Sequence, residues 1–226
     1  YAKMPGAPAL RLQMNPDDLK SWTFRRCLDY IDQNTWQNLK FVAKQLGLTG
    51  SSVVLTLFAA VLGRWSETQD FLINLTTFER DPMLHSQIVE IIGDFTSVIL
   101  LEVHTSSYGR EPFKDSVRKV LQQLNSDLRH KQYDGVRVQQ ELHRLSKNSA
   151  VAPVVFTSLL NLPLADGHES VGQRFGKVAF SITQTPQVWL DCKVFEADSR
   201  LAVEWDYVAD LLPSDHVQGM HEAFCR

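Results

Sequence analysis

The feature that most constrains the fold is a change of hydrophobic period along the chain. In the first two thirds, apolar residues recur every three or four positions, which is typical of amphipathic helices. One such helical face consists of Trp36, Leu39, Val42, Ala43 and Leu46. After about residue 150 the period becomes two, which is typical of β-strands. We therefore expect an α/β fold in which layers of helix cover one mixed sheet.

The periodic segments predict the following elements. The expected helices are Asp32–Leu46, 49–65, Glu111–Arg129, Gly135–Leu145 and 213–226. Asn34 or Thr35 is the expected N-cap of the first helix, and the second is apolar almost all round and so should be central. The expected strands are Leu19–Leu28 (a weak signal), Asp70–Thr77, Thr96–Val103, Val154–Leu160, Val178–Thr183, Val188–Phe195 and Leu201–Tyr207, the last two joined by a hairpin turn.

Composition narrows the class of protein. The chain has 226 residues, 44% of them hydrophobic and 22% charged, which fits one globular domain with a real core. A net charge of −3 argues against a broad basic face for nucleic acid, and no apolar run approaches the roughly 18 residues of a membrane span. Three widely spaced cysteines without a CxxC pair argue against a disulfide framework and a zinc site, so we expect a cytoplasmic protein.

Two literal motifs have simpler structural explanations. Residues 130–135 (HKQYDG) match HxxxDG, in which the His is a general base in acyltransferases of the chloramphenicol acetyltransferase type. Here His130 follows a helix rather than a strand, so we expect an exposed helix C-terminus. Residues 210–215 (DLLPSD) match a DxxxxD spacing, but Asp215 falls in the first turn of a helix. His216 and His221 are five apart, which is not a metal-ligand spacing on a helix.

Polar residues inside apolar strands are more informative. Thr157 and Ser158 interrupt the run PVVFTSLL, and Gln184, Gln187 and Asp191 surround Val188–Leu190. A carboxylate beside Trp and Leu is costly to bury unless it is paired or functional, and partial desolvation would let it act as acid or base near neutral pH. The simpler alternative is a strand-end Asp that faces solvent. Residues 93–96 (GDFT) predict a turn that leads into a buried strand.

Taken together, five segments resemble the heterocyclization domains of non-ribosomal peptide synthetases, a branch of the condensation-domain family. They occur in the family's order: Met4–Leu12, Asn74–Arg80, Ile92–Thr96, Pro153–Ser158 and Gln184–Asp191. The last two match nearly to the letter, while Glu79 stands where Asn is more usual. The resemblance covers essentially the whole chain.

The resemblance implies a chloramphenicol-acetyltransferase-like lobe with a mixed β-sheet flanked by helices. The family has two such lobes around a tunnel, and its paired aspartates (DxxxxD) lie in the N-terminal lobe. Since that motif is missing, we expect 1–14 to be an inter-lobe linker and 15–226 to be the C-terminal lobe only, with the N-terminal lobe absent. The chain lacks an initiating Met and ends without a helix-capping signal, which also favours a piece of a longer protein.

In this family an acyl thioester is condensed with a carrier-bound Cys, Ser or Thr, and the amide is cyclodehydrated to a thiazoline or oxazoline, as in siderophore or other natural-product biosynthesis. The resemblance implies that Thr157 and Asp191 are catalytic. It assigns the substrate channel to Ser158, Gln184, Gln187, Gly93, Asp94, Phe95 and Thr96.

No metal or directly bound cofactor is implied, because 4′-phosphopantetheine is carried by the partner carrier domains. The other implied partners are the N-terminal lobe and an adjacent adenylation domain. Two alternatives stay open: a non-catalytic lobe that docks carrier domains as a scaffold, and a free-standing HxxxDG acyltransferase. The second of these requires a strand before His130.

Overall fold

A computed structural model of the chain describes residues 4–78, 83, 85–146, 151–160, 182, 185 and 187–226. The helices are α1 (Gln33–Gln45), α2 (Gly50–Trp65), α3 (Phe113–Leu128), α4 (Gly135–Ser146) and α6 (Ser214–Cys225). The strands are β1 (Phe24–Ile31), β2 (Asp70–Phe78), β3 (Thr96–His104), β4 (Val154–Ser158), β5 (Leu190–Ala197) and β6 (Arg200–Val208). Short 3₁₀ turns lie at Pro16–Asp18 and Ser86–Val89.

The strands of the described ranges form one six-stranded mixed sheet in the order β1-β6-β5-β4-β2-β3. Strand β4 runs parallel to both β2 and β5, and the other neighbours are antiparallel. The turn between β5 and β6 has positive φ at Asp198 and Ser199, 50° and 62°, as a type I′ hairpin turn requires. The predicted α/β architecture and this hairpin are confirmed.

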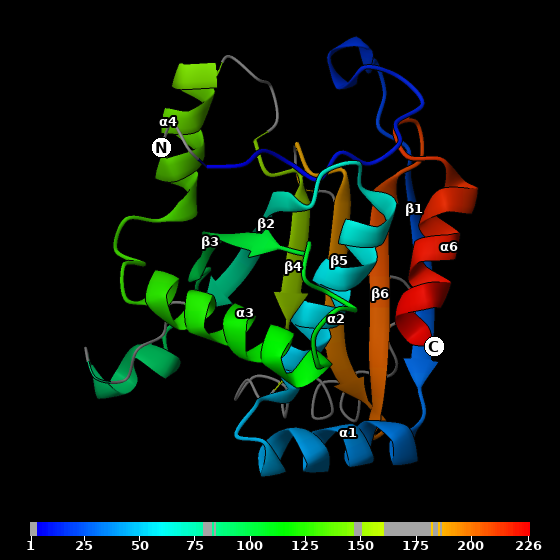
Figure 1. Cartoon of the computed structure of the whole chain (residues 1–226). Coiled ribbons are helices and arrows are strands. Elements are labelled where there is room, and N and C mark those ends of the chain that lie inside the picture. The colour runs from blue at the N-terminus through cyan, green and yellow to red at the C-terminus, as the bar shows by residue number, and fades with distance from the viewer. Residues whose placement is uncertain are drawn as a thin grey trace.

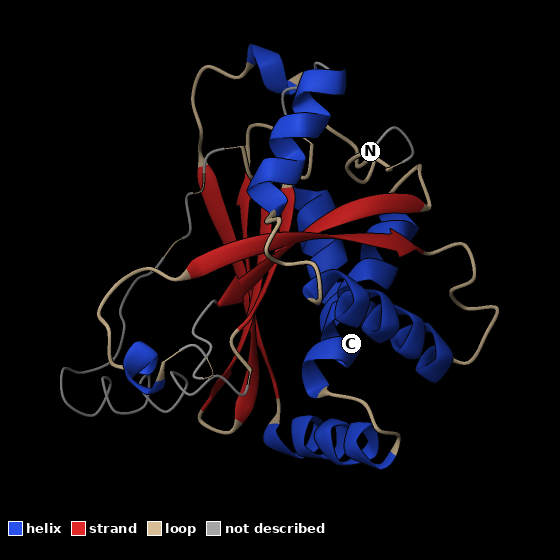
Figure 2. Cartoon of the chain, turned by 90° about the vertical axis from the view of Figure 1, so that its left-hand side faces the viewer, coloured by secondary structure: helices blue, strands red, loops and turns tan. Residues whose placement is uncertain are grey.

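One face of the sheet is covered by α2, α3 and α6 (Figure 1). Helix α2 is central, as its nearly continuous apolar character predicts. Its Phe58 is fully buried, and its ring contacts those of Phe156 on β4, Trp205 on β6 and Phe224 on α6 at centroid distances of 5.6, 5.3 and 6.4 Å. The core therefore lies between this helical layer and the sheet, and Figure 2 shows most helices gathered on one side of the twisted strands.

The opposite face is covered at one end by α4. Leu72 and Leu100, on β2 and β3, pack there with Leu142 of α4 and with Ala152. Among the described residues no other helix covers this second face, whose β1, β6, β5 and β4 portions carry polar side chains. The sheet therefore has one mainly apolar face and one face that is partly polar.

Three details differ from the sequence expectations. The N-cap of α1 is Asp32 rather than Asn34 or Thr35, because its carboxylate accepts hydrogen bonds from both of their backbone N–H groups at 2.9 and 3.1 Å. The first strand begins at Phe24 instead of Leu19, and the N–H of Thr23 donates to the Asp210 carboxylate at 2.7 Å. Strand β4 ends at Ser158 instead of Leu160. The expected strand Val178–Thr183 is not tested, because it falls outside the described residues except for Ile182.

The described part of the N-terminal segment runs across the lobe (Figure 1). Its Leu10 is buried in the core. The Gly6 carbonyl accepts from the N–H of Leu72 at 2.9 Å, and the N–H of Gln13 donates to the Leu211 carbonyl at 2.8 Å. This segment is therefore bound along its length to the lobe.

Within the described part of the chain, no single helix is long and apolar enough to cross a membrane. Only α1 and α2 taken together have the required length and composition, and they are bent by 105° at the break between them.

Candidate functional site

The two residues expected to be catalytic lie on neighbouring strands and on the same face of the sheet. Asp191 of β5 is paired in register with Val155 of β4, and Thr157 is paired with Lys193. Side chains two residues apart on a strand point to the same side, so Thr157 and Asp191 both project from the polar face. They are diagonal neighbours rather than direct partners.

The polar face is organised in two rows across the strands. The first row contains Arg26 on β1, Asp206 on β6, Asp191 on β5, Val155 on β4 and Asn74 on β2. The next row contains Glu204, Lys193 and Thr157, followed by Thr76. Thr157 and Thr76 are joined by a hydrogen bond of 2.9 Å between their hydroxyl oxygens, which fixes the side chain of Thr157.

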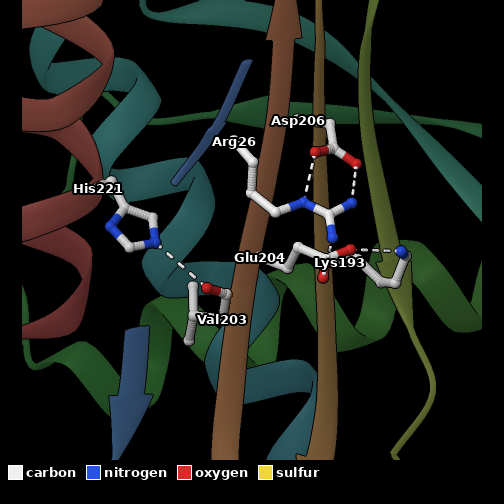
Figure 3. A network of polar contacts seen from close by, with 6 residues as sticks. All are labelled: Arg26, Lys193, Val203, Glu204, Asp206 and His221. Carbon is white, nitrogen blue, oxygen red and sulfur yellow. Dashed lines mark hydrogen bonds and ion pairs between the residues drawn. The ribbon is translucent and has the colours of Figure 1, made fainter. Parts of the chain in front are cut away.

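An ion network links three strands on this face (Figure 3). Arg26 donates from Nε and Nη2 to the two carboxylate oxygens of Asp206 at 2.7 and 2.6 Å. Its Nη1 lies 2.8 Å from Glu204 Oε2, and Lys193 Nζ donates to Glu204 Oε1. The bond to Asp206 is the largest cause that raises the pKa of the Arg26 guanidinium above its ordinary value.

Asp191 lies beside this network. It is 7% exposed, and its antiparallel partner Asp206 is 3% exposed. Like charges directly opposite each other in a sheet are unfavourable, so the cations Arg26 and Lys193 have to offset the carboxylates around them. The charge of Asp191 also contributes to the raised pKa of Arg26, which places the two groups within electrostatic reach. A buried carboxylate in this setting is chemically suited to hold and release a proton.

The residues assigned to the channel are not all brought to this face. Ser158 follows Thr157 on the strand and points to the other side, where its hydroxyl donates to Ser51 Oγ of α2 at 3.0 Å. Gln184 lies outside the described residues. Gln187 is exposed, with a positive φ of 67°. The channel roles of these residues remain predictions.

The segment Gly93–Thr96 lies at the edge of the sheet, where Thr96 begins β3. The turn is held by Asp94, whose carboxylate accepts from the N–H of Thr96 at 2.8 Å. Hydrogen bonds from the side chain and backbone of Thr96 lower the pKa of Asp94. Gly93 and Asp94 are exposed and Phe95 is half-buried. Since β2 and β4 separate β3 from β5, the segment is not adjacent to Asp191.

A cavity of about 460 Å³ lies between α4 and the β2 end of the polar face. Its polar lining comes from Asn74, Gln139, Gln140, His143, Thr185 and Gln187. Asn74 is 8% exposed, and among the described residues its Oδ1 has no hydrogen-bond partner. Asn74 and the α4 amides were missed by sequence reasoning, because only the placement of α4 over β2 brings them together.

The ion network was also missed, although the sequence carries a signal for it. In the segment Leu201–Tyr207, large apolar residues alternate with Ala202, Glu204 and Asp206. On a strand this pattern puts Glu204 and Asp206 on one face. Their burial at 5% and 3% then requires cationic partners.

The two literal motifs have structural roles. His130 is exposed just beyond α3, with Nδ1 3.0 Å from the Ser126 carbonyl, and Asp134 accepts from the N–H of Arg137 at the start of α4. Asp215 lies in the first turn of α6, as expected. The buried His221 of α6 donates from Nε2 to the Val203 carbonyl at 3.2 Å (Figure 3), and burial lowers its pKa. Within the described ranges, no three His, Cys, Asp or Glu residues gather as a metal site.

Comparison with known proteins gives a consistent match. The condensation-domain family model matches residues 8–226. The chain is 36% identical over 225 residues to pyochelin synthetase PchF of Pseudomonas aeruginosa, and the alignment covers 98% of the chain and 12% of that protein. It is 34% identical over 204 residues to phenyloxazoline synthase MbtB of Mycobacterium tuberculosis, and the alignment covers 90% of the chain and 14% of that protein.

Among solved structures, the EpoB NRPS cyclization-docking bidomain from Sorangium cellulosum superposes with a TM-score of 0.85 at 33% identity. The match covers 99% of this chain and 44% of that one. It confirms the expected chloramphenicol-acetyltransferase-like lobe with a mixed sheet flanked by helices. The chain spans about an eighth of the length of PchF and less than half of the EpoB bidomain.

Proposed function

Because this chain belongs to the condensation-domain family of non-ribosomal peptide synthetases, a family of enzymes, we propose that it is one lobe of a heterocyclization domain. In this proposal, residues 15–226 are the C-terminal lobe and residues 1–14 connect it to an N-terminal lobe. The match over 44% of the EpoB bidomain supports this division, as do the relatives, which include a cyclization-docking bidomain and a phenyloxazoline synthase.

The observation that carries the proposal is the placement of Thr157 and Asp191 on one polar face, on adjacent strands. The overall reaction joins an acyl thioester to a carrier-bound Cys, Ser or Thr and then closes a thiazoline or oxazoline ring. The second stage is the harder one, because an amide carbonyl is a weak electrophile and hydroxide is a poor leaving group. It therefore needs a group that can both accept and return protons.

Asp191 is proposed to perform both transfers. As a carboxylate it accepts the proton of the attacking thiol or hydroxyl while the new C–S or C–O bond forms, and it returns that proton to the former carbonyl oxygen. It then accepts the proton of the amide nitrogen and delivers it to the hydroxyl group, which leaves as water while the C=N bond forms. The carboxylate is regenerated, and one water is lost.

Thr157 is proposed to orient Asp191 or the intermediate through its hydroxyl. Its hydrogen bond with Thr76 supports this role, because it restricts the rotamer of Thr157. The substrates would arrive on 4′-phosphopantetheine arms of upstream and downstream carrier domains, with an adenylation domain adjacent, in the cytoplasm. Gln184, Gln187 and Gly93–Thr96 keep the channel roles proposed from the family resemblance, whereas the side chain of Ser158 lies on the opposite face of the sheet from Thr157, where it binds Ser51.

The isolated chain is proposed to be inactive, because the tunnel of the family requires walls from two lobes. The test is to join it to its N-terminal lobe, supply loaded carrier domains and analyse the products by mass spectrometry. A product lighter than the linear amide by one water supports the proposal. A product that stays linear under all conditions contradicts heterocyclization and favours a scaffold or simple condensation role. Turnover by the 226 residues alone would contradict the half-domain assignment.

A further inference from the structure

Asp191 and Asp206 are direct cross-strand partners between β5 and β6, and both are more than nine-tenths buried. The Cβ atoms of such partners are typically about 4.5–5.5 Å apart. At this separation, in an environment with little water, the charge on one carboxylate strongly affects proton binding by the other. The state of Asp206 therefore bears directly on what Asp191 can do.

Asp206 is held rigidly from the other side by Arg26. The guanidinium makes two parallel hydrogen bonds to the carboxylate, at 2.7 and 2.6 Å, and its third nitrogen binds Glu204 at 2.8 Å. A planar fork of this kind fixes both position and orientation, and it remains charged across the physiological pH range. Figure 3 shows the guanidinium lying between Asp206 and Glu204, with Lys193 beyond Glu204.

In the part of the chain that the structure describes, the charged groups that face Asp191 come from three strands. They are Arg26 on β1, Glu204 and Asp206 on β6, and Lys193 on β5 itself. The facing residues on β4 and β2 are Val155, Thr157, Asn74 and Thr76, none of which is charged. Within the described residues, and with Asp191 included, three carboxylates lie beside two cations. Each proton that Asp191 gains or loses therefore changes the net charge of this cluster.

We propose that Arg26 and Asp206 are positioning residues for Asp191, which together set the pH range over which Asp191 transfers protons during ring closure. Arg26 neutralises Asp206 and holds it away from Asp191, so that Asp191 can be a carboxylate at the start of the cycle. This inference rests on the proposed function and adds two residues that do not touch the substrate. Both act only through the electric field and packing around Asp191.

Two single substitutions should move the acidic limb of the pH profile of the ring-closure rate in opposite directions. In Arg26→Gln, the charge of Asp206 is no longer neutralised by Arg26 and favours the protonated form of Asp191, so the limb moves to higher pH. In Asp206→Asn, the uncompensated charge of Arg26 favours the carboxylate, and the limb moves to lower pH. Each shift should be about 1–3 pH units, the range for a charge within about 4–6 Å. The double variant should return towards the wild-type profile.

The first measurement is a ¹³C NMR titration of the Asp191 carboxyl in the 226-residue chain. Its signal is assigned as the one that disappears in Asp191→Asn. The second is the rate of ring closure between pH 5 and 9 in the protein that contains both lobes. Arg25→Gln is the matched control, because Arg25 is the preceding residue of β1 and faces the other side of the sheet. It removes the same charge and should leave both titrations unchanged.

Opposite shifts in the two single variants, reversed in the double variant, support the inference. If the titration midpoints of wild type and Asp206→Asn are equal, the inference is overturned, even when ring closure proceeds. This comparison does not need Arg26→Gln, so it can be made if that variant fails to fold. Shifts in the same direction in both variants indicate a structural effect and also overturn it. A wild-type protein that forms only linear amide is a distinct outcome, which removes the proposed function and this inference with it.

Discussion

Replacement of Arg26 by Met should reduce the free energy of unfolding by about 3–5 kcal/mol, the usual cost of breaking a buried pair by removing one partner. Arg26 contacts two carboxylates, Asp206 and Glu204, whose side chains are 2% and 7% exposed. At an effective dielectric constant of about 20, unit charges ~4 Å apart attract by about 4 kcal/mol, so the two pairs give about 8 kcal/mol before desolvation is subtracted. Met fills much of the space of the Arg stem but offsets neither charge.

The assay is urea denaturation of the chain followed by circular dichroism, with the free energy taken from the midpoint and slope. Arg118→Met is the matched control, because Arg118 and Asp115 form a pair at 2.9 Å whose side chains are 45% and 40% exposed. That substitution should change stability by no more than about 1 kcal/mol. The reasoning is refuted by an Arg26→Met loss below about 1 kcal/mol, or by an equal loss in Arg118→Met.

Three further predictions follow from other parts of the molecule. Phe58→Ala should cost about 3–5 kcal/mol of unfolding free energy, measured by the same denaturation, because it opens a cavity between α2 and the sheet. His130→Ala should leave product formation by the two-lobe protein within a few-fold of wild type, whereas a loss of several orders of magnitude would restore the acyltransferase alternative. Burial raises the pKa of Glu196, but hydrogen bonds from Lys40 and Trp36 lower it on balance. The ionised Glu196 therefore stabilises the fold at pH values above its unfolded-state pKa, and this stabilisation is lost as pH falls. Glu196→Gln should lose less unfolding free energy between pH 5 and pH 3 than wild type does, and an equal loss in both proteins would contradict this interpretation.

Sequence periodicity predicted the architecture well because burial acts locally on both helices and strands. The all-round apolar character of residues 49–65 placed α2 in the core, and the period of two placed β5 and β6 in the sheet. The start of β1 was predicted less well, since it depends on pairing with β6 about 180 residues away and on the capture of Thr23 by Asp210. Such long-range contacts leave no local pattern.

The site was only partly predictable for the same reason. The strand period alone separates Thr157 from Ser158, because adjacent residues on a strand point to opposite faces. Thr157 and Asp191 could be named from motifs, but their diagonal offset follows from the β4–β5 register. The contact of Asp206 with Arg26 joins residues from opposite ends of the chain, and only the sheet order brings them together.

The proposed roles of Thr157 and Asp191 are tested most directly by the ratio of cyclised product to linear amide in Asp191→Asn, measured by mass spectrometry in the two-lobe protein with loaded carriers. Asn is nearly isosteric with Asp and cannot shuttle the proton, so ring closure should slow by about 10²–10⁴ while the linear amide accumulates. Thr157→Val should act in the same direction, and the double variant should be little worse than either single variant. A cyclised yield in Asp191→Asn equal to that of wild type would contradict the account.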